Sequence, residues 1–224
     1  MNALYNMQFA HPKQNQLLMH VRIAQTPLCF LVFMLSTFWG GGNAVAQTVI
    51  PQSGWSLHHV DSEEVVGENG AAVNAFDGDG GTHWVTQWSG GPAPPYPHDL
   101  QIDLGALYEI EGVRYLPRDP SGGANGRIGQ YELYVATDSA TPPTIPLVLG
   151  EWTLVASNTF PNSAVEQEVL FSAATSRYVW LRALSEAQGT GNPWAAVGEF
   201  NVLGTLSSGL GIAPAIVAVT VGGQ

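Results

Sequence analysis

The sequence predicts an all-β fold, an antiparallel β-sandwich of the jelly-roll type. Its short segments alternate apolar and polar residues, a pattern typical of strands that bury one face. Clusters of Gly, Pro, Asn and Ser separate these segments, and no apolar stripe of helical period continues over roughly ten residues. Strands and turns that follow one another along the whole chain favour an antiparallel sandwich.

This alternation predicts six strands. In chain order they are Asp99–Leu104, Ile110–Tyr115, Tyr131–Ala136, Val165–Phe171, Tyr178–Ala183 and Glu199–Leu203. The stretch from Ile50 to Gly204 that contains them is long enough to bury a core without disulfides.

The first 46 residues have the pattern of a processing segment. Lys13 and Arg22 precede an apolar run over 27–39, and Ala44-Val45-Ala46 supplies a cleavage site of small residues. A membrane anchor is the alternative, but the run is shorter than the roughly 20 apolar residues that a spanning helix needs. We therefore predict a cleaved signal peptide over 1–46 and a secreted protein, either extracellular or periplasmic.

The rest of the chain is predicted to form a domain over 47–204, followed by a tail over 205–224. The tail combines a linker-like SSGLG with the apolar run AIVAVTV, which is too short to span a membrane.

Charge narrows the class of partner. The net charge of the whole chain is −11, and loss of Lys13 and Arg22 with the signal peptide would leave no lysine at all. A chain this acidic is a poor partner for nucleic acids and for anionic membranes. Neutral ligands and divalent cations are better candidates.

The segment NAFDGDGGTHWVTQW, residues 74–88, is the densest motif of the chain. Asp-Gly pairs are strong turn formers, so an ordinary hairpin turn with solvated acids is one interpretation. A loop that wraps a hard cation is the other, because its glycines let backbone carbonyls turn inward beside the carboxylates.

The chain resembles the discoidin, or coagulation factor 5/8 type C, superfamily. The residues that carry this resemblance are, in chain order, Trp55, Ser62, NAFDGDGGTHW, TQW, PHDLQIDLG, YLPRD, NGRIGQYELYV, RYVWLRA and WAAVGEF. Within it, the chain is most similar to bacterial carbohydrate-binding modules of the galactose-binding-like fold. The resemblance runs over nearly all of residues 51–204 and implies the same β-sandwich.

The resemblance also implies a structural Ca²⁺. In the family, an acidic loop and a glutamate from the last strand hold this ion. The acidic loop of this chain is residues 74–82. By position, the ligands here would be Asn74, Asp77, Asp79, Thr82, Gly198 and Glu199. Such a set of carboxylate, hydroxyl and carbonyl oxygens suits Ca²⁺, which takes six to eight oxygen ligands.

A neutral glycan is the partner that the resemblance implies, of the galactose type or another neutral sugar. Sugar modules of this family bind at loops on one end of the sandwich. The matching positions are Glu64, Trp88, Arg118, Asn125 and Trp194. Tryptophan can stack on the C–H face of a pyranose, while arginine, amide and carboxylate groups read its hydroxyls.

One position departs from the family pattern. Galactose-binding relatives commonly carry a histidine in W-H-T-x-W, where this chain has Val85 in W-V-T-Q-W. Valine neither donates nor accepts a hydrogen bond, so a galactose-type ligand is in question. His83, two residues earlier, would lie on the same side of an extended segment.

The sequence predicts a module without catalytic activity. The carboxylate pairs Asp77/Asp79 and Glu63/Glu64 are the candidates for acid–base chemistry, but the first is better used on a metal and the second lies in a loop. There is no nucleophile elbow, HExxH motif, Cys/His pair or phosphate-binding loop.

Two alternatives to free sugar binding remain. The module could grip a protein partner in cell adhesion, through the Pro-rich loops over 89–97 and 139–150, or it could be an accessory domain of a glycan-active enzyme.

Overall fold

A computed structural model describes residues 47–118, 124–137 and 149–207. The predicted signal peptide and residues 208–224 of the predicted tail lie outside this part. The described part holds eight strands: β1 (Ser56–Val60), β2 (Trp84–Val85), β3 (His98–Leu116), β4 (Gln130–Ala136), β5 (Thr153–Thr159), β6 (Gln167–Ala183), β7 (Ala196–Val197) and β8 (Glu199–Leu206). Its helices are the 3-10 turns η1 (Gln52–Gly54), η2 (Ala72–Phe76) and η4 (Leu149–Glu151). None of the helices in the described residues is long and apolar enough to cross a membrane.

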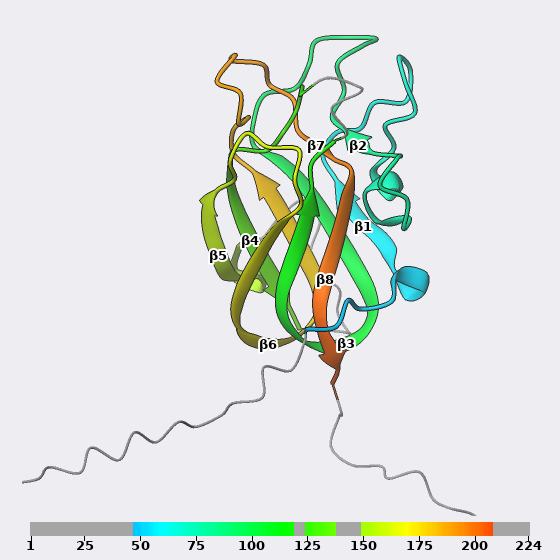
Figure 1. The fold of residues 1–224 in the computed structure, drawn as a ribbon. Coiled ribbons are helices and arrows are strands. Elements are labelled where there is room, and N and C mark those ends of the chain that lie inside the picture. Colours follow the sequence, from blue (N-terminus) through cyan, green and yellow to red (C-terminus); the bar gives the residue numbers. More distant parts are fainter. Residues whose placement is uncertain (1–46, 119–123, 138–148, 208–224) are drawn as a thin grey trace, which may run out of the picture. The chain divides into compact units, whose positions relative to one another are not determined.

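The two longest strands build both layers of the sandwich (Figure 1). The first half of β3 pairs with β1 on one side and with the second half of β6 on the other, and β4 and β5 extend this layer. The second half of β3 lies between the first half of β6 and β8. All these pairs are antiparallel, so the predicted antiparallel β-sandwich is confirmed.

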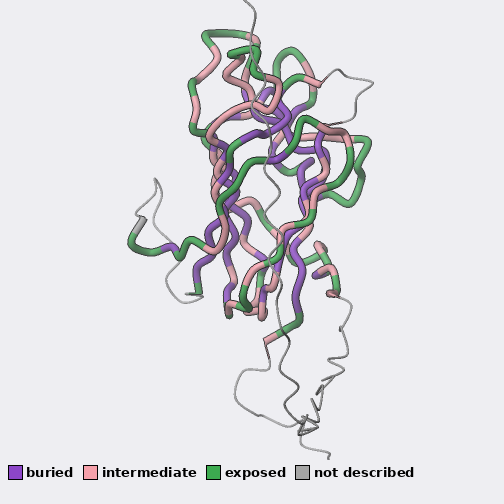
Figure 2. Tube along the Cα trace, turned by 60° about the vertical axis from the view of Figure 1, so that its left-hand side comes forward, coloured by how far each residue is buried: buried purple, intermediate pink, exposed green. Residues whose placement is uncertain are grey.

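The core lies between the layers and follows from the alternation along the strands. Leu100 and Ile102 on the first half of β3 are fully buried, as are Val113 on its second half and Val202 on β8. Figure 2 shows buried residues along the strands and exposed residues mainly in the loops beyond them.

The predicted strand boundaries need correction. The segments expected at 99–104 and 110–115 are one strand, β3, and those expected at 165–171 and 178–183 are largely one strand, β6. Pairing continues through the predicted breaks because register shifts between Asp103 and Tyr108 absorb the interruption. Gly105 lies in this stretch with a φ of +79°, a conformation that glycine adopts without strain.

The short ribbon of β2 and β7 organises one end of the sandwich. Trp84 pairs with Val197 and Val85 with Ala196, and Arg127 forms a parallel bridge to Ala196. The loops over 61–83, 86–97 and 184–195 flank this ribbon at the same end (Figure 1). Segments far apart in the chain therefore meet here.

Candidate functional site

A pocket of about 310 Å³ opens at the end of the sandwich that carries β2 and β7. It gathers four of the five side chains predicted to contact a ligand, and these come from three connections of the chain: Trp88 follows β2, Arg118 and Asn125 lie between β3 and β4, and Trp194 precedes β7. The lining residues are Gly67, Glu68, Val85, Trp88, Arg118, Asn125 and Trp194. The sequence therefore identified most of this pocket, but it missed Glu68.

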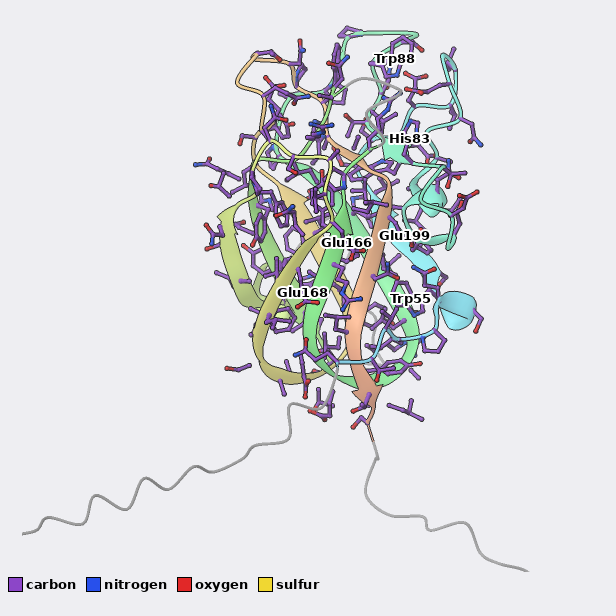
Figure 3. The ribbon with its side chains drawn as sticks, viewed as in Figure 1. Trp55, His83, Trp88, Glu166, Glu168 and Glu199 are labelled. Carbon is purple, nitrogen blue, oxygen red and sulfur yellow. The ribbon has the colours of Figure 1, made fainter. Side chains whose placement is uncertain are left out.

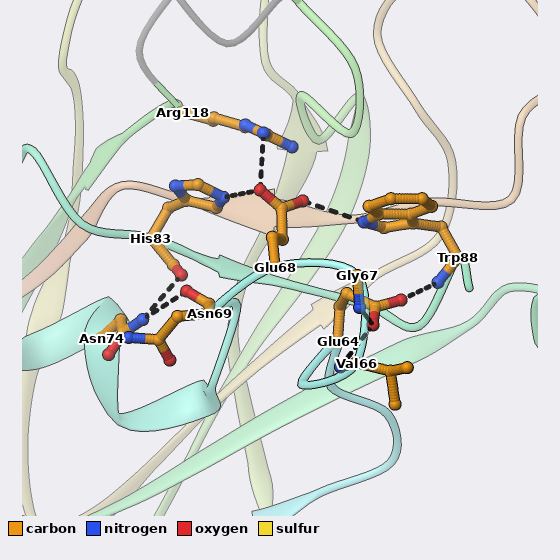
Figure 4. Close-up of polar contacts among 9 residues, drawn as sticks. All are labelled: Glu64, Val66, Gly67, Glu68, Asn69, Asn74, His83, Trp88 and Arg118. Carbon is orange, nitrogen blue, oxygen red and sulfur yellow. Dashed lines mark hydrogen bonds and ion pairs between the residues drawn. The ribbon is translucent and has the colours of Figure 1, made fainter. Parts of the chain in front are cut away.

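Glu68 connects three of the polar groups around the pocket (Figure 4). Its Oε1 accepts a hydrogen bond from Trp88 Nε1 at 2.8 Å, and its Oε2 accepts one from Arg118 Nη2 at 3.0 Å. His83 Nε2 lies 3.2 Å from the same Oε2. One carboxylate thus orients an indole and a guanidinium and offsets the charge of Arg118.

The Trp88 ring is held in place but open to solvent. Its exposed fraction is 41%, unusual for a tryptophan. Gly67 lies directly beside it, because a Cβ at this position would come within 2.7 Å of ring atom Cη2. An exposed ring with a fixed orientation is a ready stacking platform.

Two N–H groups around the pocket have no hydrogen-bond partner in the described part of the chain. They are Nε of Arg118 and Nε1 of Trp194, and both atoms are buried. A buried donor left unpaired costs about 1–3 kcal/mol.

Val85 contributes an apolar wall, and His83 does not replace the missing histidine there. The Val85 side chain is buried in the β2–β7 ribbon. His83 is not among the residues that line the pocket, and its ring contacts Glu68 instead (Figure 4). Burial and the neighbouring Arg118 lower the pKa of His83 despite the opposing effect of Glu68, so His83 is neutral at pH 7.

Glu64 does not line the pocket, and its predicted ligand contact is corrected. Its side chain is fully buried. Oε1 accepts hydrogen bonds from the backbone N–H groups of Val66 and Gly67, and Oε2 accepts those of Trp88 and Ser89, all at 2.7–2.9 Å. Glu64 therefore fastens the loop that carries Glu68 to the loop that carries Trp88.

The electrostatics of Glu64 agree with this structural role. Burial raises the pKa of its carboxyl, but the hydrogen bonds from Gly67, Trp88, Val66 and Ser89 outweigh burial and lower the pKa to about 2. The group is ionised at any physiological pH, and its charge is shared among fixed donors.

The acidic loop contributes no residue to the lining of the pocket and is internally hydrogen bonded. Asp77 accepts from the backbone N–H of Asp79 at 2.9 Å and from the Thr82 hydroxyl at 2.8 Å. The Thr82 hydroxyl also lies 2.9 Å from the Asp79 carbonyl oxygen. Gly78 has a φ of +83°, which lets the chain turn here.

Glu199 faces this loop from β8, away from Trp88 (Figure 3). Its Oε1 accepts from Gln52 Nε2 at 2.5 Å, and its Oε2 is buried with no hydrogen-bond partner in the described part of the chain. Burial raises the pKa of Glu199, and the charges of Asp77 and Asp79 raise it further, whereas the hydrogen bond from Gln52 and the nearby Gly78 backbone N–H lower it. An unpaired carboxylate oxygen beside two further acids fits a cation.

The other two predicted metal ligands, Asn74 and Gly198, have contacts elsewhere in the fold. The Asn74 amide donates to the carbonyl oxygens of Asn69 at 2.9 Å and His83 at 3.1 Å, so this side chain braces the loop over 61–83 internally. Gly198 lies against Pro117, whose carbonyl oxygen would be 3.0 Å from a Cβ. Within the described ranges no three acidic, histidine or cysteine side chains form a metal site by themselves. A cation would therefore need carbonyl and hydroxyl oxygens as well, and calcium binding stays a prediction.

A sandwich whose end loops gather an aromatic ring, a guanidinium and an amide around one pocket has the construction of a small-ligand binding domain. Residues 59–200 match the family model of the F5/8 type C domain, and the chain belongs to this family. The predicted discoidin resemblance is thereby confirmed.

The known proteins similar to the chain include a sialidase and two modules whose structures contain a bound sugar. A sialidase of Micromonospora viridifaciens is 39% identical over 157 residues, which cover 70% of this chain and 22% of that protein. Among solved structures, CpGH89CBM32-5 from Clostridium perfringens, in complex with GalNAc-β-1,3-galactose, has 30% identity and a TM-score of 0.57, covering 69% of this chain and 99% of that one. The family 32 carbohydrate-binding module of C. perfringens NanJ, in complex with galactose, has 28% identity and a TM-score of 0.56, covering 70% and 99%.

The match to the sialidase is confined to one part of it. The chain spans 22% of the sialidase and 17% of a galactose oxidase of Gibberella zeae, which is 32% identical over 57% of this chain. It covers nearly the full length of the two Clostridium modules. The similarity therefore concerns a module and not a whole enzyme.

Proposed function

We propose that the chain is a non-catalytic carbohydrate-binding module that holds a neutral glycan in the end-loop pocket. The observation that carries this proposal is the meeting of Trp88, Arg118, Asn125 and Trp194 around one cavity. Family membership and the sugar complexes of the two Clostridium modules support it.

The chemistry of the pocket suits a hydroxylated ring. Trp88 offers an exposed apolar face, and Arg118 and Asn125 offer donors and an acceptor at its side. Glu68 balances the charge of Arg118, and the chain as a whole is strongly acidic, so an anionic sugar gains little electrostatic attraction. A neutral sugar is not repelled by the negative charge of the chain.

We also propose that Ca²⁺ binds between the acidic loop and Glu199 as a structural ion. Asp77, Thr82, Asp79 and Glu199 would supply oxygens, and the buried unpaired Oε2 of Glu199 is the atom that most needs a cation. The bound ion would tie a loop near the start of the domain to its last strand.

The natural setting of such a module would be a larger exported, glycan-active protein. The partial match to the sialidase supports this setting, and the signal peptide predicted over 1–46 agrees with it. The module would hold the larger protein on its glycan substrate.

The function is tested on a printed array of neutral and acidic glycans, with sedimentation on vesicles of anionic lipid in parallel. The proposal expects saturable binding to neutral glycans and no vesicle binding. Vesicle binding without any glycan binding would overturn it. Absence of both would favour the protein-adhesion alternative.

A further inference from the structure

A second, larger pocket lies beside the first, between the loops over 86–97 and 184–195. Its volume is about 580 Å³, and Pro95, Tyr96, Glu186, Asn192 and Pro193 are among its lining residues. We propose that it is a second sugar subsite, so that the module binds a neutral oligosaccharide across two pockets. This inference rests on the proposed glycan binding in the first pocket.

One wall of each pocket comes from the same segment, residues 193–194. Pro193 lines the second pocket, and Trp194, its neighbour in the chain, lines the first. Consecutive Cα atoms are about 3.8 Å apart, so the linings of the two pockets adjoin in this segment, and we expect a longer glycan held at Trp194 to extend towards the second pocket.

This wall is held firmly. The Tyr96 hydroxyl donates to the Trp194 carbonyl oxygen, and His98 Nε2 lies 2.7 Å from the Pro193 carbonyl oxygen. Burial and the nearby Glu186 raise the pKa of Tyr96, so its hydroxyl remains a donor at physiological pH. A fixed wall keeps both pockets open together and limits the ordering cost of binding.

The surface of the second pocket combines apolar faces with a polar edge. Pro95, Tyr96 and Pro193 present ring faces on which C–H groups of a sugar can pack. Gly189 and Gly191 leave space, because no heavy atom lies within 4 Å of where a Cβ would stand at either position. Their φ values of +67° and +80° favour glycine, so the opening is built into the backbone.

The polar edge selects against anions. The Glu186 carboxylate is held by the Thr190 hydroxyl at 2.7 Å and by the Asn192 backbone N–H at 3.1 Å. The residues that line the pocket include no lysine, arginine or histidine. An acidic sugar would meet an uncompensated carboxylate, whereas hydroxyl groups can donate to it.

The test is isothermal titration with neutral glycans of one to six residues, chosen as a length series of the best binder on the array. In the parent protein, affinity should rise about tenfold from the monosaccharide to the longer glycans, equivalent to about 1.4 kcal/mol. Asn192→Trp, which fills the second pocket, should remove this rise and leave monosaccharide affinity unchanged. Leu154→Trp, at a 51% exposed position on β5, is the matched control and should behave as the parent.

Amide NMR gives a second readout that needs no variant. The signals of Gly189 and Gly191 should shift with the longer glycans and stay in place with the monosaccharide. Equal affinity along the series, or unmoved glycine signals, would overturn the second subsite while leaving the first pocket intact. If the parent protein binds no glycan at all, both the proposed function and this inference are overturned.

Discussion

Glu64 and Glu68 lie four residues apart in one loop and have different tasks. Glu64 is buried and holds backbone N–H groups of two loops together, whereas Glu68 is partly exposed and holds the side chains that line the pocket. Sequence pattern alone could not separate them, because both are acids among Gly, Val and Asn. The hydrogen-bond partners that each carboxylate meets in the fold decide their roles.

The lowered pKa of Glu64 makes stability depend on pH. Its pKa is about 2 in the folded protein against a usual 4.5, so its contribution to stability is complete above pH 4.5 and is lost as pH falls towards 2. We expect Glu64→Gln to lower the free energy of unfolding at pH 7 and to flatten its decline between pH 4.5 and 2. Urea denaturation across this range measures both effects.

Glu111→Gln on β3 is the matched control for this variant, because Glu111 is a half-exposed acid away from the pocket. It should leave the pH dependence as in the parent. If the slopes of Glu64→Gln and the parent coincide over the acid range, the hydrogen bonds to Glu64 do not stabilise the fold as described.

At the scale of the elements, alternation found β3, β4, β6 and β8, but none of the six predicted segments covers β1 or β5. The segments over 131–136 and 199–203 match β4 and β8 closely. The predictions for β3 and β6 each divided one strand in two, because glycine and polar residues interrupt the pattern while the backbone pairing continues. The two-residue strands β2 and β7 are too short for any periodicity, and their pairing joins residues more than a hundred positions apart.

The acidic loop and β8 are where a metal would join two elements. Ca²⁺ that binds only the folded state should raise its stability by about 2.7 kcal/mol at a hundredfold excess over Kd. We expect a higher melting temperature in calcium than in chelator, and Glu199→Gln should abolish most of this increment. The Glu111→Gln variant should keep the full increment.

Differential scanning calorimetry of protein prepared in chelator, then titrated with Ca²⁺, makes the measurement. Identical melting curves of the parent with and without Ca²⁺ would rule out a structural ion at this loop. A full calcium increment in Glu199→Gln would place the ion elsewhere.

At the scale of the whole molecule, the sandwich acts as a frame that brings distant loops to one end. One pocket is lined by residues that span more than a hundred positions of the sequence, namely Trp88, Arg118, Asn125 and Trp194. Their types and order were enough to predict them through the family pattern. Glu68 and the second pocket were not predictable, because they depend on how the loops over 61–83 and 184–195 fold against their neighbours.

The central claim is that this pocket binds a neutral glycan through Arg118. The most direct test is isothermal titration of the best array glycan into the parent, Arg118→Ala and Arg114→Ala. Arg114 is the matched control, because it is not among the residues that line the pocket and pairs at 2.8 Å with Glu168. Figure 3 shows Glu168 well away from Trp88. Loss of charge-assisted hydrogen bonds of about 1.5–3 kcal/mol predicts roughly tenfold to hundredfold weaker binding by Arg118→Ala. Arg114→Ala should bind as the parent does, and equal affinity of all three proteins would contradict the claim.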